Sequence, residues 1–164
     1  MSTTTNTDRA ALPTLGLGCY WQDLSVGQRF RTLRRTITET DLINFISTTG
    51  MLEAIFIDAE FEGGAIRGRP VPAALTQCLI EGLLFQSMIQ GTGLALLEMT
   101  LKALAPVQVG DTVWATVTVT GIRPTSKHNR AVIDSQIDVY NTRDEAVLTY
   151  TAKRLLAGRD SLSP

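Results

Sequence analysis

The chain has 164 residues, 44% of them hydrophobic and 19% charged, which is typical of a globular protein with enough residues for one hydrophobic core. A net charge of −1 argues against nucleic acid or an anionic membrane surface as the main partner. The single histidine, His128, excludes any site that needs two histidine ligands from one chain.

The two cysteines, Cys19 and Cys78, lie far apart and match no metal-binding or redox spacing. Because Cys78 lies in an apolar run, we expect a buried thiol there. The first dozen residues are polar and rich in Ser and Thr, unlike a signal peptide. No apolar stretch has the length of a membrane span, so the sequence predicts a cytoplasmic protein.

The polar start of the chain (residues 1–18) is interpreted as a flexible arm. A single domain is predicted for residues 19–158, followed by a C-terminal tail (159–164). An exposed or edge strand is expected within 28–37, where four arginines occur.

A helix is predicted to begin after Thr38, because Thr38 and Asp41 have the spacing of a capping box. Gly50 is expected to end this helix. The next segment, residues 50–72, is long and irregular, which is more often functional than ordinary inside a compact domain. Residues 73–90 are apolar on nearly all sides, which predicts a helix that other elements must surround.

The remaining chain predicts strands over 94–104, 111–120, 130–140 and 146–156, with a strict alternation of two in 111–120. A long antiparallel sheet wrapped around one central apolar helix satisfies both burial patterns. The predicted fold class is therefore α+β.

Four motifs resemble those of the MaoC-like acyl dehydratases and (R)-specific enoyl-CoA hydratases, which have the hot-dog fold. They are Tyr20-Trp-x-Asp-Leu-x-Val-Gly27, Thr38-Glu-x-Asp-Leu-x-x-Phe45 with Thr49-Gly50, Arg69-Pro-Val-Pro-Ala-Ala-Leu-Thr76, and Leu104-Ala-Pro-Val-x-Val-Gly-Asp-Thr112. The resemblance implies a hydro-lyase acting on acyl-CoA thioesters. It also implies a homodimer or larger homo-oligomer with a continuous sheet.

The usual catalytic side chains of that family are absent. By resemblance, Met51 stands at the catalytic Asp, Phe56 at the catalytic His and Pro72 at the His of the third motif. The candidate replacements are Glu53 and Asp58, since apolar neighbours can raise the pKa of a carboxylate into the range useful for acid/base chemistry. The alternatives are that Glu53 caps a turn and that Asp58 opens a short helix.

Two binding roles are also implied by the resemblance. The backbone N–H at Ala73 would hold the thioester oxygen at a helix start. The cluster of Arg123, Lys127 and Arg130 would bind the CoA phosphates, or else form a solvated hairpin tip. CoA is expected as substrate carrier, with acyl carrier protein as the open alternative, and no metal or other cofactor is predicted.

Glu81 is an isolated carboxylate in an apolar helix and therefore needs a partner or water. A buried hydrogen bond or a dimer contact is the favoured interpretation.

Three functions remain open at this point. The first is an acyl-CoA hydratase or dehydratase with a non-standard acid/base group, and the second is a hot-dog thioesterase. The third is a non-catalytic acyl-CoA-binding subunit that pairs with a catalytically complete homologue, in a hetero-oligomer.

Overall fold

The computed structural model describes residues 14–159, so residues 1–13 of the predicted arm and 160–164 of the predicted tail lie outside the described part. In chain order the elements are η1 (Trp21–Asp23), β1 (Arg29–Arg31), β2 (Arg35–Thr36), α2 (Glu39–Thr49), α3 (Ala54–Ile57), α4 (Ala73–Phe85), β3 (Gly93–Ala103), β4 (Thr112–Pro124), β5 (Arg130–Asn141) and β6 (Ala146–Ala157).

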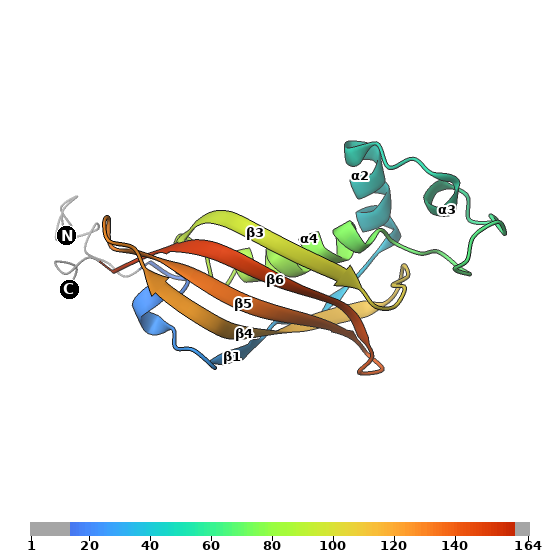
Figure 1. The fold of residues 1–164 in the computed structure, drawn as a ribbon. Helices are drawn as coiled ribbons and strands as arrows, with labels where there is room; N and C mark the ends of the chain where they lie inside the picture. The colour runs from blue at the N-terminus through green and yellow to red at the C-terminus, as the bar shows by residue number, and fades with distance from the viewer. Residues whose placement is uncertain (1–13, 160–164) are drawn as a thin grey trace, which may run out of the picture.

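The described strands form one six-stranded sheet with the order β1-β4-β5-β6-β3, and β2 also pairs with β4. All strand pairs are antiparallel. Figure 1 shows the sheet curved along α4, with α2 and α3 beyond one end. The predicted sheet wrapped around a central helix is confirmed.

The core forms where the inward side chains of β4, β5 and β6 meet α4. Val117, Ile137 and Ile80 are all 0% exposed, and each such aliphatic side chain stabilises the fold by about 1.5–3 kcal/mol relative to exposure. The alternating burial along β4 and β5 confirms the predicted period of two.

The predicted start of α2 is confirmed by a reciprocal cap. The Asp41 N–H donates to Thr38 Oγ1 at 3.2 Å, and the Thr38 N–H donates to the Asp41 carboxylate at 2.8 Å. Burial raises the pKa of Asp41, but the hydrogen bonds from Thr38 and the charge of Arg35 together lower it by more. The pKa of Asp41 is therefore below its ordinary value. Gly50, with φ of 73°, ends the helix in the left-handed region.

Two details of the central helix differ from the prediction. It ends at Phe85 rather than near residue 90, and Cys78 is exposed, so the prediction of a buried thiol is wrong. Cys78 and Phe85 are seven positions apart and share a helix face. The sheet covers the opposite face, which contains Ile80 and Leu84.

We expect Asp41→Asn to lower the free energy of unfolding by about 1 kcal/mol at neutral pH, because it weakens the cap of α2. Since the folded-state pKa of Asp41 is depressed, the stability that it contributes is present above the unfolded pKa of about 4 and is lost as the pH falls through the folded pKa. The difference from wild type should therefore shrink below about pH 4 in urea unfolding. Glu62→Gln, in an exposed loop, is the control, and a difference that grows on acidification would contradict this role.

Candidate functional site

An apolar cavity of about 410 Å³ lies where α4 begins. We call it the α4-start cavity. Phe56, Pro72 and Ala73 line one side, and Ala103 and Val147, from the end of β3 and the start of β6, line the other. The positions that the resemblance assigns to the two family histidines and the family glycine, Phe56, Pro72 and Ala73, therefore come together, although they come from two separate segments.

The first turn of α4 presents backbone N–H groups beside this cavity, and no described side chain caps them. Pro72 is the N-cap residue and has no side chain that can bond to them. The first N–H groups of an α-helix have no partner inside the helix, and the helix dipole favours negative charge there. The site can therefore stabilise an oxyanion with backbone groups, as expected for Ala73, whose role in binding remains a prediction.

Among the described lining residues, Thr76 alone has a polar side chain. It is 0% exposed, and its hydroxyl has no described hydrogen-bond partner. No titratable side chain belongs to the described lining. The cavity can hold an apolar chain, but it supplies no group that transfers a proton.

The two positions that the resemblance assigns to the acid/base pair differ in their surroundings. Phe56 packs against the core and lines the cavity, whereas the Met51 side chain is 40% exposed and is outside the lining.

Glu53 and Asp58 flank α3 and are both exposed. The Glu53 carboxylate accepts the N–H of Ile55 at 2.9 Å and caps the start of α3. Asp58 accepts the N–H of Glu60 at 2.9 Å and ends α3 rather than opening a helix. Neither residue belongs to the described cavity lining, and their acid/base roles remain predictions.

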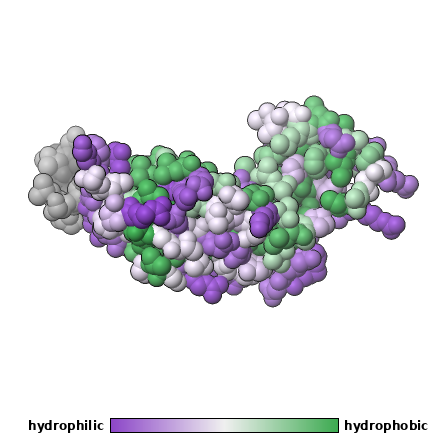
Figure 2. Space-filling model, viewed as in Figure 1, coloured by the Kyte–Doolittle hydropathy of each residue, from purple (hydrophilic) through white to green (hydrophobic). Residues whose placement is uncertain are grey.

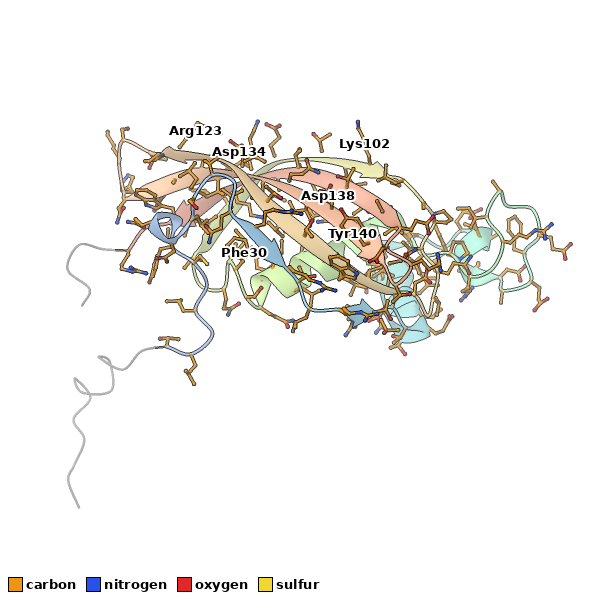
Figure 3. The ribbon with its side chains drawn as sticks, turned by 90° about the horizontal axis from the view of Figure 1, so that it is seen from below. Phe30, Lys102, Arg123, Asp134, Asp138 and Tyr140 are labelled. Atoms are coloured by element: carbon orange, nitrogen blue, oxygen red, sulfur yellow. The ribbon has the colours of Figure 1, made fainter. Side chains whose placement is uncertain are left out.

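The predicted phosphate-binding residues lie at the other end of the sheet. Arg123 pairs with Asp134, and Figure 3 shows these two together at the end away from α2 and α3. Lys127 and Arg130 are exposed on the same β4–β5 hairpin. One chain therefore does not bring this hairpin beside its own α4-start cavity, and the phosphate-binding role stays a prediction.

A buried polar cluster joins α4 to β6. Glu81 Oε1 accepts the Tyr150 hydroxyl at 2.6 Å and an Arg154 guanidinium N–H at 2.5 Å. The predicted hydrogen bond of Glu81 is confirmed, but sequence reasoning missed its two partners. The alternation along β6 could have predicted them, because Tyr150, Ala152, Arg154 and Leu156 are every second residue and all face inward.

The part of the chain from 14 to 159 contains no group of three potential metal ligands of the His, Cys, Asp or Glu types. Its helices are also too short or too polar to cross a bilayer.

The sequence and the fold correspond to those of known dehydratases. The profile of the FAS1-like dehydratase domain region matches residues 25–150, and the chain belongs to this family. It is 28% identical over 108 residues to the (R)-specific enoyl-CoA hydratase of Rhodospirillum rubrum, covering 66% of this chain and 74% of that protein.

Two solved structures have the same fold. A MaoC-like dehydratase from Rhodospirillum rubrum is 26% identical, with a TM-score of 0.76 over 87% of this chain and 99% of that one. A Mycobacterium tuberculosis protein with a double hot-dog fold is 20% identical, with a TM-score of 0.77 over 90% of this chain and 46% of that one. The predicted MaoC-like resemblance and hot-dog fold are confirmed.

Proposed function

We propose that this protein is a hydro-lyase that adds water to, or removes water from, acyl-CoA thioesters. The observation that carries the proposal is the α4-start cavity, in which an apolar lining meets uncapped helix N–H groups. Such a site can take an acyl chain and stabilise the charge that develops on a thioester oxygen. Membership of a dehydratase family and the likeness to an (R)-specific enoyl-CoA hydratase support this choice of reaction.

The carrier is proposed to be CoA, with the phosphates held by Arg123, Lys127 and Arg130. Addition of water to a carbon–carbon double bond is redox-neutral, so the proposed reaction needs no further cofactor. The proposed compartment is the cytoplasm.

A second candidate is a subunit that binds acyl-CoA without turning it over and pairs with a catalytically complete homologue. The observation in its favour is that no titratable side chain belongs to the described lining of the cavity. A thioesterase remains a third candidate, since it would need the same oxyanion site and one carboxylate.

We also propose that two copies pair through β3. This strand is at the end of the sheet order, and its leucines, including Leu96 at 52% and Leu101 at 37%, are exposed. Figure 2 shows hydrophobic side chains gathered over β3 as well as over the α2 and α3 end. A long, apolar, unpaired edge strand invites pairing with another chain, and an isologous pairing with itself closes as a dimer.

The reaction is tested by incubating the purified protein with saturated, 2-enoyl and 3-hydroxyacyl-CoA thioesters and weighing the products by mass spectrometry. We expect a gain of water on the 2-enoyl members and a loss of water from the 3-hydroxy members. Release of free CoA from saturated members would identify a thioesterase. A panel that is bound but left intact would support the non-catalytic subunit.

The sequence-based assignment of Glu53 predicts that Glu53→Gln lowers kcat by about 100-fold or more, because an amide cannot act as general acid or base. The amide oxygen can still accept the Ile55 N–H, so the cap of α3 is retained. Glu60→Gln is the matched control in the same loop. Unchanged turnover in steady-state assays would restrict Glu53 to capping.

The dimer predicts that Leu96→Glu/Leu101→Glu converts the protein into a monomer, since it puts charges into the apolar interface. Molar mass is read by light scattering after size exclusion. Leu33→Glu, at a side chain that is 80% exposed outside β3, should remain dimeric. A wild-type chain that stays monomeric at all concentrations would overturn the homodimer and direct the search to a second type of chain.

A further inference from the structure

The buried Glu81–Tyr150–Arg154 cluster has unused hydrogen-bonding capacity. Both described bonds to Glu81 end on Oε1. No described hydrogen bond ends on Oε2, and Glu81 lines a cavity. Burial, and then the charge of Glu81, raise the pKa of the Tyr150 phenol far above its usual range. Tyr150 is therefore a permanent donor that orients the carboxylate.

Two members of this cluster, Glu81 and Arg154, form the polar wall of a second cavity, of about 230 Å³. We call it the β3-edge cavity. Glu81 and Arg154 face Phe85, Leu94 and Leu96 there, and these three apolar side chains are 46–54% exposed. An ion pair that borders an open apolar surface is placed to meet another molecule.

The two cavities lie at opposite ends of one helix–strand pair. The α4-start cavity contains Ala73, at the start of α4, and Ala103, at the end of β3. The β3-edge cavity contains Phe85, at the end of α4, and Leu94, near the start of β3. When β3 pairs antiparallel with the same strand of a second copy, the start of one strand lies beside the end of the other. The β3-edge cavity of each copy therefore comes beside the α4-start cavity of its partner.

Charge complementarity selects a register for this pairing. Glu98, Thr100 and Lys102 alternate along β3 on one face, opposite Lys153, Thr151 and Thr149 of β6. If the two-fold axis that relates the two copies passes through Thr100, Glu98 of each copy lies opposite Lys102 of the other. Opposite charges across paired strands attract. The same register brings the partner's Leu96, at the rim of the β3-edge cavity, to Ala103 and Leu104 of the α4-start cavity.

We propose that the partner's Glu81 is the acid/base group of each α4-start cavity. This inference rests on the proposed hydro-lyase function and dimer. It supplies from the second chain the carboxylate that the described lining lacks, and it assigns to Glu81 the proton transfer that sequence reasoning assigned to Glu53.

The step is balanced with one carboxylate. Glu81 takes a proton from water as the water oxygen bonds to the β-carbon of a 2-enoyl thioester. The electrons of the double bond move onto the thioester oxygen, which the N–H groups at Ala73 stabilise. Glu81 then returns its proton to the α-carbon, the carbonyl reforms, and the product is a 3-hydroxyacyl thioester.

The first test is Glu81→Gln, assayed on the 2-enoyl-CoA that the wild type hydrates fastest. We expect kcat to fall by about 100-fold or more, with KM nearly unchanged. Gln leaves Arg154 without a counter-charge, so Glu81→Gln/Arg154→Met, which removes both charges, is a second variant if the first does not fold. A folded dimer of either variant with wild-type kcat would overturn the proposal and leave the proposed function standing.

The second test asks which chain supplies Glu81. Ala73→Phe blocks the α4-start cavity but keeps Glu81, whereas the Glu81 variant keeps the cavity open. Each should be inactive alone. Each mixed dimer made by joint refolding contains one intact site of two. Because random pairing makes about half of the dimers mixed, the mixture should recover about a quarter of wild-type activity.

No recovery in proven mixed dimers would mean that Glu81 does not act across the interface and would overturn the proposal. A wild-type protein that leaves every 2-enoyl and 3-hydroxyacyl thioester intact would overturn the proposed function and this role of Glu81 together.

Discussion

The structure depends on how α4 is covered. The sheet can bury one face of this helix, represented by Ile80 and Leu84, and it leaves the face of Cys78 and Phe85 open. Both cavities follow from this one-sided cover. At its start, α4 lies beside the end of β3 and exposes its first N–H groups. Near the end of α4, the Glu81–Arg154 ion pair borders an apolar surface. An uncovered side of a central helix also gives a physical reason for two chains to associate.

Much of the fold could be predicted because local patterns dictate it. The alternation in β4 needs only one buried face, and the Thr38–Asp41 cap is formed by residues three positions apart. The exposure of Cys78 could not be predicted, since it depends on which side of α4 the sheet covers. The partners of Glu81 were also beyond local reasoning, because Tyr150 is 69 positions away.

In the candidate site, backbone N–H groups can stabilise an oxyanion, whereas proton transfer needs a side chain. By the resemblance, Pro72 and Ala73 stand at the family histidine and glycine, and the helix start and its dipole are intact with these two residues. By the resemblance, Phe56 stands at the position of a catalytic histidine, and its side chain makes this part of the cavity wall apolar. The motifs near Ala73 therefore point to a cavity at the start of α4, but they do not supply its acid/base group, because Glu53 is an exposed cap of α3 outside the described lining.

Pairing through the open edge of β3, as proposed, would tie the assembly state of this protein to its concentration. Pairing of two identical edges is a second-order process, so the paired fraction falls on dilution. A site that needs residues from both copies would lose specific activity at low concentration, even if every chain is folded. In a cell, the amount of active protein would then rise more steeply than the amount of chain synthesised, which gives gene expression a threshold-like control over the reaction.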